Sequence, residues 1–290
     1  MDKLDLAKRM KEYYEQVSKT RLMKRCPVII RCDGRSFHSF TKKFQKPFDE
    51  LLIKTMQETT KYLCENIQGC VLGYTQSDEI SLLLVDYKRL NSSSWFDYEV
   101  QKMCSITASM ATMAFNKFFM FEFEEFDRWI CDGSPTDGER QLYDVYYDAI
   151  CKGAMFDARV FNIPKEEVTN YFLWRQFDAM RNSVQMVGQA HFSHEELQNK
   201  TGDVIQEMLL SQKRIDWSNL PLYQQRGSCC VKEEYWVDDK GVEFPSILIY
   251  QGFGENANKR TRWIIDKNIP IFKGDGRDYI EKLIWVGGEQ

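Results

Sequence analysis

The chain has 290 residues, of which 43% are hydrophobic and 14% aromatic, and its 39 basic and 43 acidic residues give a formal net charge of −4. This length and apolar content suffice to bury a core, which excludes a globally disordered chain. The acidic balance excludes a protein that coats DNA through overall positive charge, although it is compatible with an RNA enzyme that has a local basic patch.

The sequence predicts neither a membrane protein nor an exported one. Its continuous apolar runs are far shorter than the roughly 18 residues of a membrane span, and the N-terminus is charged rather than signal-like. The nine cysteines include no CxxC pair, and the three histidines show no metal-ligand spacing. We therefore expect reduced, mostly buried thiols in a cytoplasmic protein, with a structural zinc site as the weaker alternative.

The first third of the chain alternates apolar periodicities with turn signals. In chain order we expect a helix at 4–18, a strand at 27–32, a helix at 48–66 and strands at 70–74 and 79–85. The first strand ends at the turn-forming pair Asp33-Gly34. Residues 75–78 are expected to be the turn of a hairpin between the last two strands.

Helical patterns dominate the next part of the chain. A polar loop at 91–94 precedes a helix at 98–119, and the acidic segment 122–140, which contains Gly133, Pro135 and Gly138, is expected to be an exposed insertion. A strand at 156–163 and a helix from Pro164 to about 190 follow.

The last hundred residues mix helical and β signals. A capping box at 193–196 starts another helix, and β structure is expected from Gly227 onward, at 231, 235–237 and 247–250. We expect residues 1–190 to form one α+β domain and residues 191–290 to form a helical and β extension packed on the same domain.

The order of elements in the first domain is strand, helix, strand, strand, helix, strand, which is that of a ferredoxin-like antiparallel sheet with helices packed on it. In such a sheet the first strand lies next to the third and antiparallel to it. The end of strand one, at Asp33, then lies beside the hairpin tip, at Asp78. Two carboxylates that are distant in sequence are therefore expected to meet at one edge of the sheet.

Two acidic side chains at adjacent strand ends suit Mg²⁺, which prefers oxygen ligands from one or two carboxylates together with substrate phosphates. The carbonyl of Gly34 is a further candidate ligand. Candidate phosphate contacts nearby are Ser36, Ser77 and Lys46. The alternative is structural, because Asp-Gly and Ser-Asp are common turn sequences in any protein.

Three further polar groups allow both a structural and a functional interpretation. In the helix at 171–183, Arg175 and Asp178 form either an ordinary i,i+3 ion pair or part of a surface that contacts RNA or nucleotide. The basic run 259–263 places cations beside Trp263, which suits phosphate binding and base stacking but also an ordinary solvated loop. His38 is either catalytic or a packed or capping histidine.

Five motifs, in order over about residues 30–180, resemble those of the tRNA-His guanylyltransferase family. They are the R-x-D-G-R-x-F-H pattern at 31–38, K-P-x-D at 46–49, G-x-x-Q-S-D-E at 73–79, F-D-A-R-V at 156–160 and W-R-Q-x-D at 174–178. A weaker similarity extends to the C-terminus. The resemblance implies a palm-like catalytic core, as in ordinary polymerases and nucleotidyl cyclases, on the same βαββαβ plan.

The resemblance also implies an activity and a set of site residues. Family members add nucleotides to tRNA 5′ ends in the 3′-to-5′ direction, using ATP, GTP or other nucleoside triphosphates and two Mg²⁺ ions. Asp33 and Asp78 are implied to be catalytic and, with Gly34, to bind the metals. The residues implied to bind nucleotide are Gly34, Arg35, Ser36, Phe37, His38, Lys46, Ser77, Asp78 and, in a looser motif, Lys102. Those implied to bind tRNA are Arg175, Asn182, Arg226, Arg260 and Arg262. A homotetramer is implied as well.

One departure from the family pattern separates two functions. Members that add guanosine opposite an unpaired base carry H-I-N-N after W-R-Q-x-D-x, whereas this chain has Met180-Arg181-Asn182-Ser183. That pattern is similar to the guanylyltransferase-like branch, which is implied to repair 5′-truncated tRNA by template-directed addition. The alternatives are guanosine addition to tRNA-His, a palm enzyme without a tRNA substrate such as a nucleotidyl cyclase, and a non-catalytic RNA-binding protein.

Overall fold

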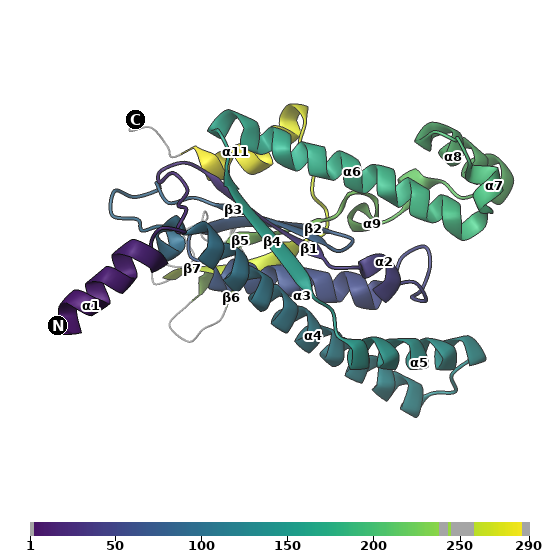
Figure 1. Ribbon diagram of the computed structural model, residues 1–290. Coiled ribbons are helices and arrows are strands. Elements are labelled where there is room, and N and C mark those ends of the chain that lie inside the picture. Colours follow the sequence, from purple (N-terminus) through teal and green to yellow (C-terminus); the bar gives the residue numbers. More distant parts are fainter. Residues whose placement is uncertain (1–2, 238–242, 245–257, 286–290) are drawn as a thin grey trace.

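One antiparallel sheet organises the protein, as shown by a computed structural model that describes residues 3–237, 243–244 and 258–285 (Figure 1). The strand order is β4-β1-β3-β2-β5-β6, with β7 also paired to β5. The strands are β1 (Val28–Gly34), β2 (Cys70–Gln76), β3 (Glu79–Leu84), β4 (Phe156–Asn162), β5 (Ser228–Val237), β6 (Glu243–Phe244) and β7 (Asn258–Asp266). The first strand lies next to the third and antiparallel to it, as the ferredoxin-like order predicts.

Helices cover both faces of the sheet. They are α1 (Lys3–Met10), α2 (Phe37–Phe40), α3 (Glu50–Asn66), α4 (Val100–Asp132), α5 (Asp137–Lys152), α6 (Lys165–His191), α7 (His194–Leu197), α8 (Gly202–Met208), α9 (Leu222–Arg226) and α11 (Asp278–Ile284). Shorter π- or 3-10-helical turns lie at Lys11–Glu15, Trp95–Tyr98, Leu209–Lys213, Trp217–Asn219 and Gly274–Arg277. In Figure 1, α3 and α4 lie below the sheet, whereas α6 and α11 lie above it.

The central strand β1 is apolar at every position from Val28 to Cys32 except Arg31. Val28, Ile30 and Cys32 belong to the core that includes residues of α3 and α4, while Ile29 belongs to the core beneath α6 and α11. Alternate residues of a strand point to opposite faces, so a strand covered on both faces needs apolar residues at nearly every position. The apolar stretch ends at Cys32, and the next residue, Asp33, lies near the end of the strand.

The segment 122–140, expected to be an exposed insertion, is largely exposed, but most of it is helical and the helix before it does not end at 119. Helix α4 continues to Asp132, well past the expected end at 119, and α5 begins at Asp137. The rings of Phe123 and Tyr143 lie 5.0 Å apart and those of Phe126 and Tyr146 5.4 Å apart, so the two helices bury aromatic side chains between them. Acidic residues occupy the outer surface of α4, and the apolar spacing at 119, 123 and 126 continues the helical period.

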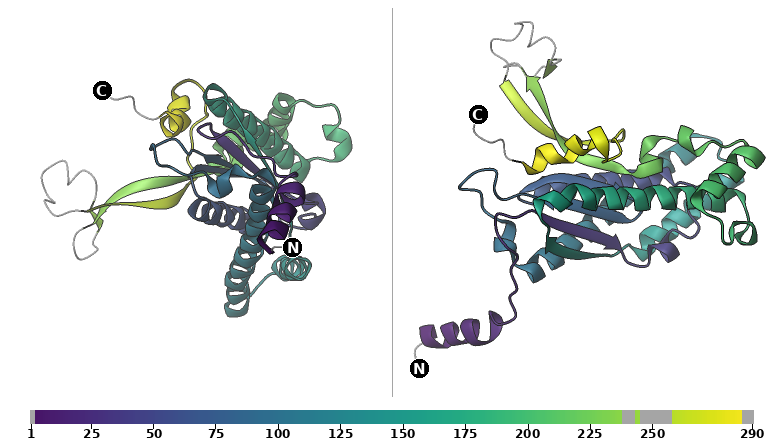
Figure 2. Two further views of the ribbon diagram at one scale, coloured as in Figure 1. Left: turned by 60° about the vertical axis from the view of Figure 1, so that its left-hand side comes forward. Right: turned by 90° about the horizontal axis from the view of Figure 1, so that it is seen from above.

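Other boundaries differ by a few residues. The hairpin turn is only Ser77-Asp78, because β2 extends to Gln76, and β1 extends through Asp33 and Gly34. The expected helix at 4–18 is α-helical to Met10 and continues as a π-helical turn to Glu15. Its apolar side chains Met10, Tyr13 and Tyr14 are exposed, because this segment extends away from the sheet (Figure 2).

The C-terminal part of the chain joins the same sheet. Residues 73–75 of β2 pair with 228–230 of β5, and residues 229–237 of β5 pair with β7 in a ribbon that extends from the body (Figure 2). The strand expected at 247–250 lies outside the described residues. All nine cysteines are free thiols, and five of them are buried. Among the described helices, none has the length and apolarity to cross a bilayer.

Candidate active site

The two predicted carboxylates lie at one edge of the sheet. Asp33 is opposite Glu79 on one side and opposite Asp157 on the other, because β1 is paired with both β3 and β4. Asp78 occupies the hairpin turn, and its carbonyl oxygen accepts a hydrogen bond of 3.1 Å from the Gly34 N–H. The backbone therefore ties the end of β1 directly to the hairpin tip, as the topology predicts.

Charge is incompletely balanced at this edge. Burial raises the pKa of Asp78 and the nearby charge of Asp33 adds to the shift, while hydrogen bonds from its own backbone and from Ser77 oppose it. Asp33 is 38% exposed, and the Arg159 guanidinium lies 3.8 Å from its carboxylate. The same guanidinium lies closer to Asp157, at 3.1 Å.

Such a donor set fits a hard divalent cation. Two nearby carboxylates repel one another unless a cation or a proton lies between them. In the part of the chain that the structure describes, no cluster of three or more His, Cys, Asp or Glu side chains is positioned to bind a metal. The edge thus offers two carboxylates, the number that Mg²⁺ commonly takes from a protein when substrate phosphates and water complete its shell.

A buried ion pair holds the hairpin tip against α6. Arg175 donates to both oxygens of Glu79, from Nε and Nη2, at 2.7 Å each, and both side chains are 9% exposed. Arg175 also donates to Asp178 at 3.0 Å, so the i,i+3 ion pair expected from the sequence is present. Burial alone lowers the pKa of the Arg175 guanidinium, but Glu79 and Asp178 outweigh that effect and raise it. Arg175 therefore positions the residue next to Asp78.

The backbone around the carboxylates is unusual for its residue types. Ser36, the N-cap of α2, and Ser77, in the hairpin turn, have φ values of 58° and 50°. Left-handed φ is uncommon outside glycine and often marks functional sites. Gly34 has a steric role, because a Cβ at this position would lie 2.2 Å from the ring of the buried Phe37. The absence of a side chain at Gly34 lets α2 pack close to the end of β1.

A cavity of about 330 Å³ opens beside the hairpin tip, between α2, the segment that follows it and α6. Five residues expected to bind nucleotide line it, namely Phe37, His38, Lys46, Ser77 and Asp78. Asp49, also in the lining, fixes the cavity wall by accepting hydrogen bonds from the Leu52 N–H, the Gln45 N–H and the Tyr146 hydroxyl, at 2.9, 3.0 and 2.7 Å. The structure therefore brings the first three sequence motifs to one cavity.

Lys102 is not brought to this cavity. Its ammonium lies over the Phe96 ring, 4.7 Å from the centroid, at the start of α4. The part of α4 that lies near the end of β1 is at Thr112, whose hydroxyl accepts a hydrogen bond from the Phe156 N–H. Thr112 is ten residues after Lys102, which corresponds to about 15 Å along the helix. A contact between Lys102 and the same nucleotide stays a prediction.

The residues expected to bind tRNA are spread over three places. Asn182 lies beside Arg175 on α6, 3.5 Å from Asp178, whereas Arg226 ends α9 and donates to the Ile269 carbonyl at 3.0 Å. Arg260 and Arg262 are in the β5–β7 ribbon, where Arg262 pairs with Glu233 at 2.9 Å. Direct contact of these residues with tRNA stays a prediction.

Two residues of the site were present in the motifs but had no role assigned to them from the sequence. The role of Glu79 as partner of Arg175 depends on a contact between residues 96 positions apart, which no local pattern reveals. Asp49 could have been recognised from the local sequence, because Asp is a typical N-cap residue just before an apolar helical pattern. In the structure it is the N-cap of α3.

Comparison with known proteins gives a consistent result. The family model described as tRNAHis guanylyltransferase matches residues 7–164. A bacterial tRNA(His) guanylyltransferase-like protein solved in complex with ATP is 36% identical, with a TM-score of 0.74 over 97% of this chain and 100% of that one. A structure of such a protein with GTP has 35% identity and a TM-score of 0.70 over 97% and 99%. A probable tRNA(His) guanylyltransferase of Dictyostelium discoideum is 27% identical, over 71% of this chain and 75% of that protein.

Proposed function

The chain belongs to the tRNA(His) guanylyltransferase family and is therefore a nucleotidyltransferase, and on that premise we propose that it repairs 5′-truncated tRNA by template-directed addition of nucleotides in the 3′-to-5′ direction. The observation that carries the proposal is the cavity in which Asp78, Ser77, Lys46 and His38 converge beside Asp33. The enzyme assignment leaves no place for the alternative of a non-catalytic RNA-binding protein.

The proposed reaction has two chemical steps. The 5′-monophosphate of the tRNA first attacks the α-phosphate of ATP, which forms an adenylylated 5′ end and releases pyrophosphate. The 3′-hydroxyl of the incoming nucleoside triphosphate then attacks the activated 5′ phosphate, forms the new phosphodiester and releases AMP. A tRNA that already has a 5′-triphosphate needs only the second step and releases pyrophosphate.

The side chains at the sheet edge suit both steps. We propose that Asp33, Asp78 and the Gly34 carbonyl hold two Mg²⁺ ions, which, when bound, favour the deprotonated hydroxyl and offset charge on the leaving group. Lys46 places a cation in the cavity for the triphosphate, and the Ser77 hydroxyl offers it a hydrogen bond. No side chain needs to form a covalent intermediate.

The test is Mg²⁺-dependent incorporation of a labelled nucleotide into a tRNA that lacks its first 5′ residue. Asp33→Asn and Asp78→Asn each remove one charge with little change in shape, and each should abolish both steps while circular dichroism stays unchanged. Full activity of either variant would contradict the metal-site assignment.

The templating base separates repair from the second candidate, guanosine addition to tRNA-His, which the names of the relatives favour. Without H-I-N-N at 180–183, selectivity must come from base pairing, in which each unmatched polar group costs about 1–3 kcal/mol. Guanosine opposite C should thus be added about ten- to hundred-fold more efficiently than guanosine opposite A. Equal efficiencies would favour the guanylyltransferase function.

A further inference from the structure

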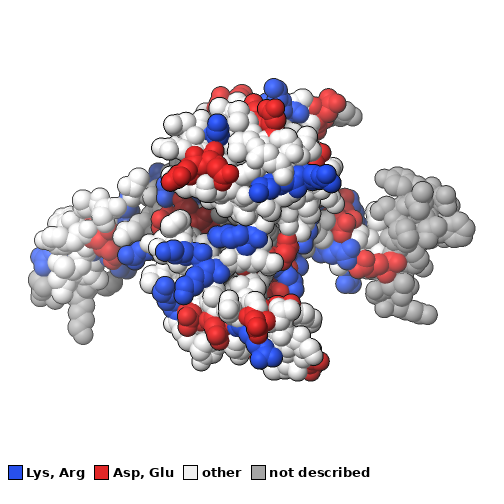
Figure 3. All heavy atoms as spheres, turned by 90° about the vertical axis from the view of Figure 1, so that its right-hand side faces the viewer, with Lys and Arg blue, Asp and Glu red and all other residues white. Residues whose placement is uncertain are grey.

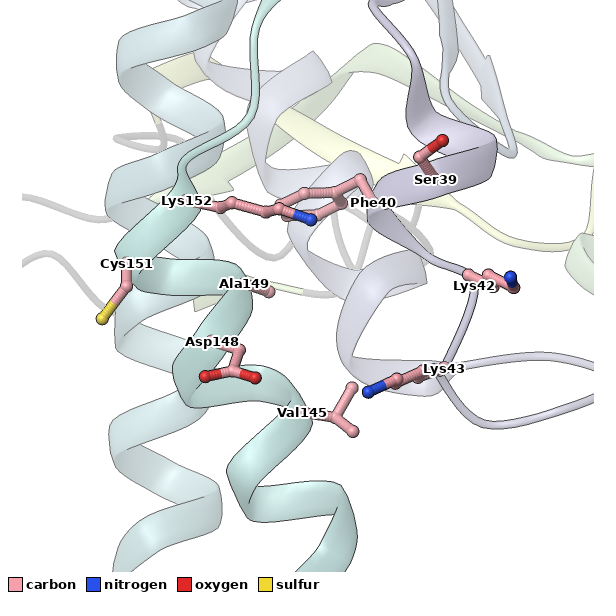
Figure 4. A pocket seen from close by; sticks show the side chains of 9 residues that line it. All are labelled: Ser39, Phe40, Lys42, Lys43, Val145, Asp148, Ala149, Cys151 and Lys152. Carbon is pink, nitrogen blue, oxygen red and sulfur yellow. The ribbon is translucent and has the colours of Figure 1, made fainter.

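A second cavity, of about 520 Å³, lies behind α2, between the segment that follows this helix and the end of α5 (Figure 4). Three lysines line it, Lys42 and Lys43 from the segment after α2 and Lys152 from the last turn of α5. In Figure 4, the Lys152 side chain extends toward the ring of Phe40, and Lys42 and Lys43 lie on the opposite wall. None of these residues has a role in the site described above.

The three lysines are free to meet an anion. All three are exposed, and among the described residues none of them forms a salt bridge. The lining contains one carboxylate, Asp148, so its formal charge is +2 from three ammonium groups and one acid. Figure 3 looks onto the side of the molecule where α2 and α5 lie in Figure 1, and basic side chains form a band across the middle of that face.

The two cavities share a wall. Phe37, His38 and Thr41 line the cavity at Asp78, whereas Ser39, Phe40, Lys42 and Lys43 line the basic one. The wall is α2 with the turn that follows it, and a helix with its side chains is about 10–12 Å across. A stacked nucleic-acid strand carries one phosphate per about 3.4 Å of axis, so this thickness corresponds to about three or four nucleotides.

We propose that Lys42, Lys43 and Lys152 bind backbone phosphates of the tRNA acceptor stem a few nucleotides from the 5′ end that is being extended. The inference rests on the proposed function, because it requires a tRNA 5′ end in the neighbouring cavity. The ligand chemistry is a phosphate group, which the RNA backbone or the triphosphate of a second free nucleotide can supply.

The lining favours the RNA backbone. Lysine ammonium groups are point charges that bind phosphate without base specificity, which is typical of backbone contacts that position a nucleic acid. Besides the lysines, the polar side chains of the lining are Ser39, Asp148 and Cys151. The lysines outnumber the single carboxylate and the single hydroxyl that could pair with a base, so the lining favours a phosphate ligand.

The test compares two triple variants of the full-length protein. The cavity variant, in which the three cations of the cavity are removed, is Lys42→Gln/Lys43→Gln/Lys152→Gln. The control variant removes the same charge from three exposed lysines outside the cavity and is Lys117→Gln/Lys273→Gln/Lys282→Gln. Binding of a 5′-truncated tRNA is measured over a range of KCl concentrations. Each lost phosphate contact lowers the slope of log K against log salt by about 0.7–0.9. We expect the cavity variant to lose about two to three units of slope, which corresponds to about 100- to 1000-fold in affinity at 0.1 M salt, and the control to lose neither.

Two further measurements separate the sources of phosphate and the role of the fold. Affinity for ATP and for GTP, measured without RNA, should be unchanged in the cavity variant. An arginine version, Lys42→Arg/Lys43→Arg/Lys152→Arg, keeps the charges and should keep the wild-type salt slope.

The inference is overturned if the cavity variant binds tRNA with the wild-type slope, if it loses ATP or GTP affinity instead, if the control variant weakens equally, or if the arginine version also fails. A wild-type protein that binds tRNA with the expected lysine-dependent slope but does not extend it would support the phosphate-binding pocket and contradict the proposed repair function.

Discussion

The ion pair between Arg175 and Glu79 is the contact whose removal should disturb the site most. Arg175→Ala removes two 2.7 Å hydrogen bonds and leaves the Glu79 carboxylate buried without its cation. Breaking a buried pair in this way typically costs about 3–5 kcal/mol. We expect the free energy of unfolding to fall by about that amount, seen as a lower urea midpoint at unchanged slope. Because Glu79 follows Asp78 directly, nucleotide addition should also slow by about 100-fold, the cost of a displacement near 1 Å.

Three variants control for other causes. Arg175→Lys keeps the charge but loses the bidentate geometry, so it should lose about 1.5–3 kcal/mol. Arg175→Met combined with Glu79→Leu removes both charges and should recover most of the stability without the activity. Arg181→Ala removes the exposed partner of Asp178 on the same helix and should change stability by less than about 0.5 kcal/mol. A loss below about 1 kcal/mol for Arg175→Ala would refute the reasoning.

Three other predictions follow from the same edge of the sheet and from the family. The pKa of Asp78 is raised above its ordinary value of 3.8, so above pH 3.8 the metal-free folded protein binds more protons than the unfolded chain. Thermal stability in EDTA should therefore fall as the pH rises through the raised pKa. Asp78→Asn should flatten this decline, and an identical profile would contradict the assignment. Gly34→Ala should cost about 1–3 kcal/mol in urea unfolding, because its Cβ overlaps the Phe37 ring, and a neutral change would show that α2 yields freely. Light scattering should show a tetramer of the 34.4 kDa chain, and a monomer at micromolar concentration would exclude it.

Much of the fold follows from local sequence patterns. The run at 28–32 is apolar except for Arg31 because helices cover both faces of the sheet, and Pro164 is the N-cap of α6, where the pattern predicts a helix to begin. The segment 122–140 is largely exposed, as its acidity suggests, but its acidity, Gly and Pro residues hid the fact that α4 and α5 run through most of it. Acidic side chains describe only the outer face of a helix, and the inner face of α4 is defined by Phe123 and Phe126 packing against α5.

The strand order alone predicts which carboxylates meet at the candidate site. Asp33 and Asp78 come together because any β1–β3 pairing in this order places a strand end beside a hairpin tip. The partner of Arg175 was not predictable in this way. Asp178 is its neighbour on the helix, and a local pattern finds that pair, but Glu79 comes from another element and makes the shorter, bidentate contact.

The sequence does not show which lysines and arginines are free of acidic partners and can therefore bind a nucleic acid. The run Lys259 to Arg262 is the densest basic segment near the C-terminus, yet Arg262 lies opposite Glu233 in the β5–β7 register, and Lys259 pairs with Glu234. Cations already paired with carboxylates release fewer counterions from RNA than free cations do. Lys43 and Lys152, by contrast, are distant in sequence and become a single basic surface only when α2 packs beside α5. The strength of a basic surface thus depends on which acids the fold places opposite each lysine or arginine, and on that measure we expect the α2–α5 cavity to bind phosphate more strongly than the ribbon.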